Sequence, residues 1–374
     1  MIPFNKASIT DREIEHVVDA MKNSILSGDG KYTAKVYEKF KDILGIENML
    51  LTTSGTAALE MASLLIELEE GDEVIVPSFT FSSTVNAFML RGSKPVFCDI
   101  RRDTMNIDET KIEDLITNKT KAIYVVDYAG VPCEMDVIND IAKRHNLHVI
   151  EDSAQAVGST YKGRSAGTLS ELGCYSFHET KNYVMGEGGA IVINDTSYLD
   201  RAEILREKGT NRRQLLKGMV DKYTWHDIGS SFLPSDILAA LLYSQMERFD
   251  EIMQKRLNVW NTYHDALLPL KEEGRLDLQT VPDYVTHNGH MFNIILPSTE
   301  VRTRVAEELK KDGIYLYICY VPLHSAPMGL KLGYDPKSCP VTEEYGERVL
   351  RLPLFADMTT EDALTVTEKL KKVL

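Results

Sequence analysis

The sequence lacks long hydrophobic runs, and no stretch approaches the roughly 20 apolar residues that a membrane-spanning helix needs. Its first residues, MIPFNKASITDREIEHVV, have neither the basic start nor the apolar core of a secretory signal. Positive charge is also scarce, because 42 Lys and Arg residues stand against 56 Asp and Glu residues, a net charge of −14. This balance argues against a nucleic-acid backbone as a partner. We therefore expect an acidic, soluble protein that binds neither membrane nor nucleic acid.

Cysteine is the next scarce residue. The chain has five cysteines, an odd number, and they form no CxxC pair and no spacing typical of metal ligands. They are Cys98, Cys133, Cys174, Cys319 and Cys339. The pattern predicts reduced thiols packed inside a cytoplasmic protein and no bound metal.

The residues that are present suit a folded protein of enzyme size. At roughly 100–200 residues per domain, 374 residues correspond to two or three domains, and 43% apolar residues exclude general disorder. Up to about residue 245, short apolar runs alternate with amphipathic stretches. The predicted strands are Met49–Thr53, Glu73–Pro77, Pro95–Asp99, Ala122–Asp127, His148–Asp152, Gly173–His178 and Ala190–Asn194, and the predicted helices are Ala57–Leu68, Ser82–Arg91, Met135–His145 and Ser197–Lys208. The alternation predicts an α/β fold with a mainly parallel, buried sheet.

The pattern changes after Ser235. Apolar residues recur with a helical period to about Leu268, which predicts one helix on the order of 50 Å long. We then expect strands at Met291–Leu296 and Ile314–Tyr320, a helix at Arg302–Lys311 and a final helix after Thr359. The chain is thus predicted to comprise a large α/β domain, residues 1–245 with an N-terminal arm, and a small α+β domain, residues 246–374.

Two motifs at predicted strand ends offer groups that could hold a cofactor. Thr52–Ala57 opens a helix with small residues, where backbone N–H groups can approach an anion, although a plain helix cap is the simpler interpretation. Pro77–Thr84 also follows a strand and contains Phe81, an aromatic residue that could stack on a flat cofactor ring. Aromatic residues are more often part of a core, so neither motif is decisive alone.

Two further motifs carry charged groups. Asp152 ends a predicted parallel strand, where such sheets place ligands, and its carboxylate could hold a pyridinium nitrogen protonated. Lys181 follows the next strand and precedes the glycine-rich turn Gly186–Gly189, and Schiff-base chemistry needs a lysine held in such a site. The alternatives are a capping Asp and a solvated surface Lys. The order of all four motifs favours a pyridoxal phosphate site.

With these motifs the chain resembles the DegT/DnrJ-type sugar aminotransferases, which depend on pyridoxal 5′-phosphate and have the fold-type I aminotransferase fold. The resemblance runs from Ile2–Asn5 to Arg351–Phe355. It looks closest to the dTDP-4-keto-6-deoxyglucose 4-transaminases through four stretches, Asp108–Thr110, Tyr128–Val131, Arg206–Arg212 and Asp227–Ser231. It implies a large domain with a seven-stranded, mainly parallel sheet and a smaller α+β C-terminal domain.

The resemblance implies roles around the cofactor ring. Lys181 would bind the cofactor covalently and then move a proton between the substrate carbon and C4′. Asp152 would pair with the pyridinium nitrogen, Gln155 would lie near the 3-hydroxyl and Phe81 would stack on the ring. Thr56, Ala57 and Ser176 would hold the phosphate, joined by Ser231 from a partner subunit.

Some positions depart from the family or have a less defined role. Ser231 stands where most relatives have Asn, and Asp127 where many have His. The match at Val321–His324 makes His324 a candidate substrate contact, whereas His178 has no assigned role. Acidic substrates also call for cationic side chains near the cofactor, for which the candidates are Arg212, Arg213 and Lys31.

The implied activity is a transamination in two halves, catalysed by a homodimer. L-Glutamate would donate its amino group and leave as 2-oxoglutarate, and dTDP-4-keto-6-deoxy-D-glucose would become dTDP-4-amino-4,6-dideoxy-D-galactose for polysaccharide biosynthesis. The alternatives are the gluco product, 3-amination of a 3-keto nucleotide sugar, or a non-catalytic binding protein. A dehydratase of the same family is disfavoured, because that branch has His in place of the lysine at Lys181.

Overall fold

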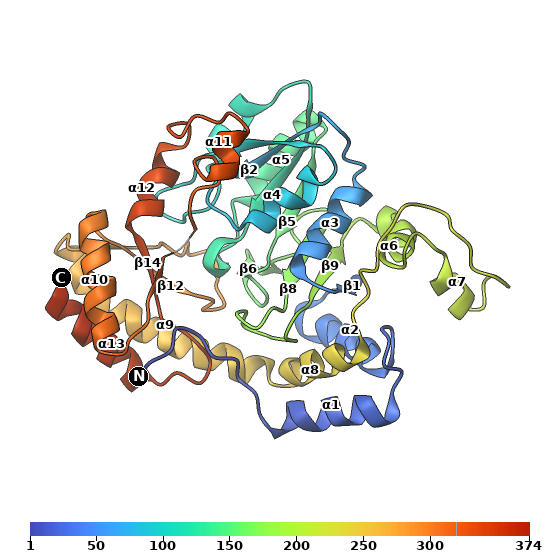
Figure 1. Cartoon of the computed structure of the whole chain (residues 1–374), viewed down its shortest axis with the longest axis horizontal. Coiled ribbons are helices and arrows are strands. Elements are labelled where there is room, and N and C mark those ends of the chain that lie inside the picture. Colours follow the sequence, from blue (N-terminus) through green and yellow to red (C-terminus); the bar gives the residue numbers. More distant parts are fainter. Residues whose placement is uncertain (319) are drawn as a thin grey trace.

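The computed structural model describes residues 1–318 and 320–374, so Cys319 lies outside the described residues (Figure 1). Its main element is a seven-stranded sheet with the strand order β1-β9-β8-β5-β4-β2-β3. The strands are β1 (Met49–Thr52), β2 (Glu73–Pro77), β3 (Lys94–Cys98), β4 (Thr120–Val126), β5 (His148–Asp152), β8 (Leu172–Ser176) and β9 (Gly189–Ile193). β9 pairs antiparallel with both β1 and β8, and the other neighbours are parallel. The predicted mainly parallel sheet is therefore confirmed.

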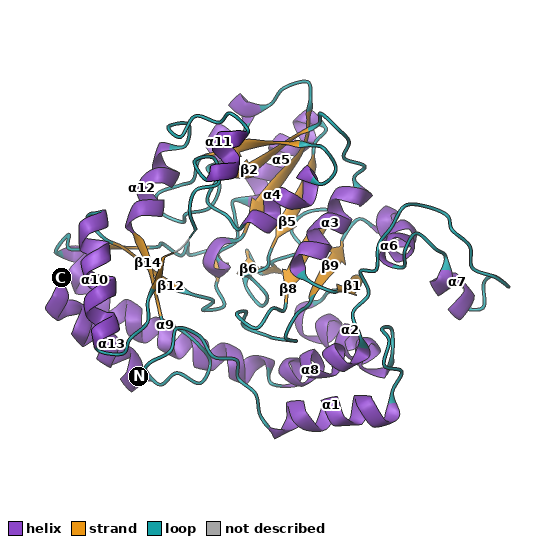
Figure 2. Cartoon of the chain, in the orientation of Figure 1, coloured by secondary structure: helices purple, strands orange, loops and turns teal. Residues whose placement is uncertain are grey.

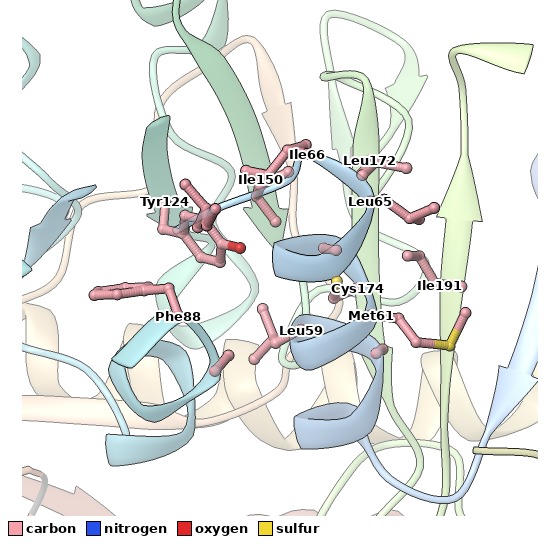
Figure 3. Packing of buried hydrophobic residues seen from close by; sticks show 14 of the residues in the cluster. Leu59, Met61, Leu65, Ile66, Phe88, Tyr124, Ile150, Leu172, Cys174 and Ile191 are labelled. Carbon is pink, nitrogen blue, oxygen red and sulfur yellow. The ribbon is translucent and has the colours of Figure 1, made fainter. Parts of the chain in front are cut away.

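Helices cover both faces of this sheet (Figure 2). On one face lie α3 (Gly55–Leu65), α4 (Ser82–Met89) and α6 (Leu199–Arg206), and on the other α5 (Met135–His145). Figure 3 shows Leu59, Met61 and Leu65 of α3 packed among the side chains of the sheet. Fully burying one such side chain contributes about 2 kcal/mol. The packing of these apolar side chains against the buried strands thus fixes the position of α3, and the N-terminus of α3 forms part of the site described below.

The long helix predicted from Ser235 to Leu268 is wrong in one respect, because the structure has two helices there. α8 (Asp236–Glu247) and α9 (Phe249–Glu272) are separated by Arg248, whose backbone is not helical (φ −106°, ψ 20°). The Arg248 guanidinium is buried and donates to Glu13 (3.0 Å), to Ser8 Oγ (3.1 Å) and to Glu251. The apolar period continues through the break, so it predicts the helices but not the bend.

Other helices pack beside this pair. α8 contacts α1 (Asp11–Asn23) and α2 (Lys31–Leu44), neither of which was predicted. α7 (Arg212–Leu216) lies on a segment that extends away from the body of the molecule (Figure 1).

The C-terminal part has its own core around a four-stranded antiparallel sheet. Its order is β10-β12-β14-β13, formed by β10 (Asp277–Leu278), β12 (Phe292–Ile295), β14 (Val349–Leu352) and β13 (Tyr317–Ile318). α9, α10 (Thr299–Lys311) and α13 (Thr360–Val373) pack in the same core, and α11 (Pro327–Lys331) and α12 (Pro340–Arg348) complete this part. A third sheet joins β11 (Val285–Thr286) to β6 (Thr160–Tyr161) and β7 (Arg164–Ser165).

Ile2 belongs to the C-terminal core, and its N–H donates to Gly313 O at 2.9 Å. The N-terminal arm is therefore attached to the C-terminal part of the chain. The domain division at residues 245 and 246 stays a prediction.

The sheet topology determines where a ligand can bind. The strands β2, β3, β4, β5 and β8 are parallel, so their carboxyl ends lie at one edge of the sheet, the edge at which α/β folds bind ligands. Asp152 ends β5 and Ser176 ends β8. Among the described residues, no helix combines the length and apolar character needed to cross a membrane.

Candidate active site

A cavity of about 530 Å³ lies at this edge of the sheet. Its walls come from the ends of β5 and β8, the start of α3, the N-terminal arm and β14 of the C-terminal part. Most of the predicted site residues line it, namely Thr56, Phe81, Asp152, Gln155, Ser176 and Lys181. The structure therefore brings together residues that are up to 125 positions apart in the sequence (181 − 56 = 125).

The start of α3 forms an end of the cavity that fits an anion. Ser54 caps the helix by accepting the Ala57 N–H (3.0 Å), and Thr56 Oγ1 donates to Ser83 Oγ (2.7 Å). β9 approaches so closely that a Cβ on Gly189 would lie 2.5 Å from the Ser54 backbone. Hydroxyl groups at the positive end of a helix dipole are suited to a phosphate group. Ser83 was not among the predicted residues.

Asp152 lies at the centre of the cavity wall. Its side chain is buried, and it accepts hydrogen bonds from Thr84 Oγ1 (2.7 Å) and from the Ala154 N–H (3.2 Å). Burial raises the pKa of Asp152 above its ordinary value, while the Thr84 hydroxyl and the charge of Lys181 oppose this rise. A buried carboxylate is costly without a positive partner. A protonated pyridine nitrogen would supply that positive charge, so these residues fit pyridoxal phosphate.

Gln155 connects the sheet to the C-terminal part. Its Oε1 accepts the Ala129 N–H (2.6 Å), and its Nε2 donates to the Tyr320 hydroxyl (2.7 Å). The Tyr320 ring contacts Phe81 and Phe79, with centroids 6.3 and 5.8 Å apart. Phe81 is 59% exposed, which is consistent with a ring that stacks on a ligand rather than inside a core. Tyr320 was not predicted, because nothing in its local sequence indicates a contact with Gln155.

Lys181 lies in the loop between β8 and β9. Its backbone N–H donates to His178 O (2.8 Å), and the side chain of the next residue, Asn182, accepts from His290 Nδ1 (2.8 Å). His290 is buried, and burial together with the positive charges of Lys181, Arg256 and Arg351 holds its pKa well below the ordinary value. A neutral His290 thus fixes the loop that carries Lys181.

The basic residues of the cavity are not the predicted ones. Arg256 and Arg351 both line it. Arg256 is buried and donates to the carbonyls of Gly289 (3.1 Å) and His290 (2.6 Å), and burial lowers its pKa to about 9. Arg351 lies over the Phe4 ring, with its guanidinium carbon 4.9 Å from the ring centre. Both arginines come from beyond the predicted site motifs, and only the tertiary fold reveals them.

The three cationic candidates from the sequence lie elsewhere in the described chain. Each forms an ion pair with an acidic residue, and none lines the cavity of this chain. The pairs are Lys31 with Asp19, Arg212 with Glu207 and Arg213 with Glu203.

Three predicted site residues do not line the cavity. Ala57 is buried in α3, and its N–H is bonded to Ser54. Ser231 is exposed and forms a β-bridge with Glu207. His324 is fully buried, with Nδ1 2.6 Å from Ser78 Oγ. The roles of these residues stay predictions.

Asp127 forms a buried acid pair with Glu151. Ser153 Oγ (2.7 Å) and the Cys133 N–H (3.1 Å) donate to Asp127, and the Gly167 N–H donates to Glu151 (2.6 Å). Burial and the neighbouring Glu151 raise the pKa of Asp127 well above its ordinary value, so Asp127 is the protonated member. The pair lies outside the cavity lining and was not predicted.

Comparison with known proteins agrees with this geometry. A model of the DegT/DnrJ/EryC1/StrS aminotransferase family matches residues 7–371. GDP-perosamine synthase from Escherichia coli O157:H7 is 32% identical over 377 residues, which cover 99% of this chain and 98% of that protein.

Solved structures are similar over the whole chain. Spr1654 from Streptococcus pneumoniae, assigned as a sugar aminotransferase, has a TM-score of 0.93 and 28% identity in its PMP form, covering 100% of this chain and 99% of that one. Its PLP form has a TM-score of 0.90. PseC from Helicobacter pylori, an aminotransferase involved in the biosynthesis of pseudoaminic acid, has a TM-score of 0.91 at 26% identity, covering 100% and 98% of the two chains.

Proposed function

Because the chain belongs to the DegT/DnrJ/EryC1/StrS aminotransferase family, and is a sugar aminotransferase that depends on pyridoxal 5′-phosphate, we propose that it transfers an amino group from L-glutamate to dTDP-4-keto-6-deoxy-D-glucose. The products are 2-oxoglutarate and dTDP-4-amino-4,6-dideoxy-D-galactose. The observation that carries the proposal is the position of Lys181 and Asp152 in one cavity with the N-terminus of α3.

Each part of the site has a task in this reaction. The cofactor, when bound, supplies the electron sink that stabilises negative charge on the carbon next to the nitrogen. The Asp152 carboxylate would keep the pyridine nitrogen protonated, and Thr84 holds that carboxylate in place. The Lys181 amine would bind the cofactor and would move a proton to and from the substrate carbon. Thr56 and Ser176, which line the cavity beside the start of α3, would hold the phosphate.

A second sugar nucleotide is favoured by one comparison. The relative from Escherichia coli is named for a GDP-linked sugar and matches 99% of this chain. A GDP-linked 4-keto-6-deoxy sugar is therefore the second candidate substrate.

The substrate experiment uses the purified protein loaded with pyridoxal phosphate. It is incubated with L-glutamate and either dTDP-4-keto-6-deoxyglucose or a GDP-linked 4-keto-6-deoxy sugar. We expect 2-oxoglutarate and the dTDP-linked amino sugar, with an NMR coupling pattern at C4 that identifies the galacto configuration. An amino sugar formed only from the GDP-linked substrate would replace the first candidate with the second. No amino sugar from either would refute both.

We also propose that two copies of the chain form the active unit. Apolar side chains that a soluble monomer would bury are exposed on α1 and on the segment around α7, and they include Ile14, Met21, Met219 and Trp225. Ser231 lies at the end of that same segment, so a symmetric partner could bring its hydroxyl to the phosphate.

Subunit mixing tests this dimer. Chains with Lys181→Ala are mixed with chains impaired by changes around Ser231, and mixed dimers should regain one intact site. An active monomer in sedimentation velocity would contradict the proposal.

The proposed location is the cytoplasm. The cysteines within residues 1–318 and 320–374, namely Cys98, Cys133, Cys174 and Cys339, are all free and buried. Free thiols are typical of reducing compartments.

A further inference from the structure

A buried polar cluster joins the end of β2 to the C-terminal part and lies outside the cavity lining. It contains Ser78, His324 and Glu343. His324 Nδ1 lies 2.6 Å from Ser78 Oγ, and His324 Nε2 lies 3.2 Å from Pro336 O and 3.3 Å from Glu343 Oε1. Serine, histidine and a carboxylate also occur together in nucleophilic sites. Ser78 and His324 are both 0% exposed, however, so this hydroxyl cannot attack a substrate.

The partners of the His324 ring determine where its proton lies. Pro336 O and the Glu343 carboxylate are hydrogen-bond acceptors, so Nε2 carries the proton. Ser78 Oγ already accepts the His324 backbone N–H (3.1 Å), and its own proton is therefore directed to Nδ1. Each polar atom of the ring thus has a protein partner, as buried polar groups require. The role of this cluster must be sought in what it holds together.

Ser78 attaches the loop 320–324 to the large sheet. Its backbone O accepts the Leu323 N–H (3.0 Å), and its Oγ accepts the N–H of His324 (3.1 Å). The N–H of Ser78 donates to Cys98 O (3.2 Å) at the end of β3, which fixes Ser78 itself. The loop belongs to the C-terminal part by sequence, but its hydrogen bonds connect it to the carboxyl end of β2.

Both sides of this contact lead directly to the cavity. Phe81, three residues after Ser78, and Tyr320, four residues before His324, line the cavity, and their ring centres are 6.3 Å apart. The Tyr320 hydroxyl also accepts from Gln155. We propose that His324 is a positioning residue of the active site, which holds Tyr320 beside Phe81 and Gln155.

This role goes beyond the proposed function and does not depend on which nucleotide sugar is the substrate. Displacing a site group by about 1 Å can lower a rate by roughly 100-fold, even when the substituted residue lies away from the chemistry. A loop released at His324 would move Tyr320 relative to the cofactor ring. His324 thereby has a task that requires no contact with the sugar.

The experiment uses the protein loaded with pyridoxal phosphate. His324→Phe keeps a flat ring and removes both nitrogens, whereas the amide oxygen of His324→Asn can still accept from Ser78. Thr342→Val is the matched control, because the buried Thr342 hydroxyl donates to Asp99 (2.8 Å) and also joins the C-terminal part to the large sheet, but through α12. The readouts are the visible circular dichroism per bound cofactor and the hydrogen exchange of segment 320–326.

We expect His324→Phe to alter the cofactor dichroism and to speed exchange in segment 320–326 roughly 10-fold, which corresponds to about 1.4 kcal/mol. His324→Asn should return both signals toward the wild type. Thr342→Val should lower the urea midpoint and leave both signals unchanged. If His324→Phe does not fold, Ser78→Ala removes the same contact with a smaller change and should alter both signals in the same direction.

Three results would overturn this role. Wild-type dichroism and exchange in a folded His324→Phe protein would show that the ring does not position Tyr320. Equal changes in Thr342→Val would make His324 a residue of general stability. Weaker dTDP binding by calorimetry with both signals unchanged would make it a substrate contact instead. Because the two signals are measured without an amino donor or a sugar, they stay informative even if the proposed substrates are not converted.

Discussion

Thr84 gives the sharpest test of how the site controls Asp152. The Thr84 hydroxyl is fully buried, donates to Asp152 Oδ2 at 2.7 Å and lies 2.9 Å from Thr80 Oγ1. Thr84→Val keeps the shape and removes this hydroxyl. A hydrogen bond to a charged group contributes about 1.5–3 kcal/mol, and one pKa unit corresponds to about 1.4 kcal/mol. The pKa of Asp152, already raised by burial, should therefore rise by about one to two further units.

The assay is the affinity for pyridoxal phosphate between about pH 5 and pH 9. A protonated Asp152 cannot pair with the protonated pyridine nitrogen, so the affinity falls as the pH drops through the pKa of Asp152 in the free protein. In Thr84→Val this fall should begin about one to two pH units higher than in the wild type. Thr84→Ser keeps the hydroxyl and should follow the wild-type curve. A Thr84→Val curve that superimposes on the wild-type curve would show that the hydroxyl does not control Asp152.

Three further predictions concern other parts of the site. Lys181→Ala should fold normally and lose turnover completely, and more than trace activity in a clean assay would remove Lys181 from the reaction. Gly189→Ala should lower the free energy of unfolding by about 1–3 kcal/mol and weaken cofactor binding, because the added Cβ would lie against the Ser54 backbone. Urea denaturation measures the free energy of unfolding, and a value equal to that of the wild type would contradict this prediction. Asp127→Asn should reduce the loss of stability at rising pH. Burial and Glu151 raise the pKa of Asp127 when folded, so the wild type loses stability as the pH rises from about 4 toward that raised pKa, and Asn does not titrate. Urea midpoints at several pH values check this, and parallel curves for both proteins would refute it.

Much of the fold could be predicted from local patterns. All seven strands of the large sheet were predicted to within two residues at each end, because buried parallel strands are short, continuous apolar runs between helices. The helix Met135–His145 and the strands Glu73–Pro77 and His148–Asp152 have the predicted bounds. The bend at Arg248 was missed, because it depends on Glu13 and Ser8, which lie more than 230 positions earlier.

The candidate site likewise contains residues that the sequence predicts and residues that it does not predict. Asp152, Lys181 and Thr56 follow strands, so topology places them together and the sequence indicates them. Arg351 and Tyr320 come from the C-terminal part, and their approach to the cavity depends on how that part packs. Charge alone did not identify the basic residues, since Lys31, Arg212 and Arg213 are equally cationic and pair elsewhere.

The division of the cavity wall between two sheets has a consequence for how such a protein can diversify. Asp152 and Ser176 end strands of the large sheet, whereas Arg351 and Leu352 belong to β14 of the small one. A substitution on β14 can therefore change which molecules enter without disturbing the groups that hold the cofactor. A sequence change confined to the wall that β14 supplies leaves the strand ends that carry Asp152 and Ser176 unaltered.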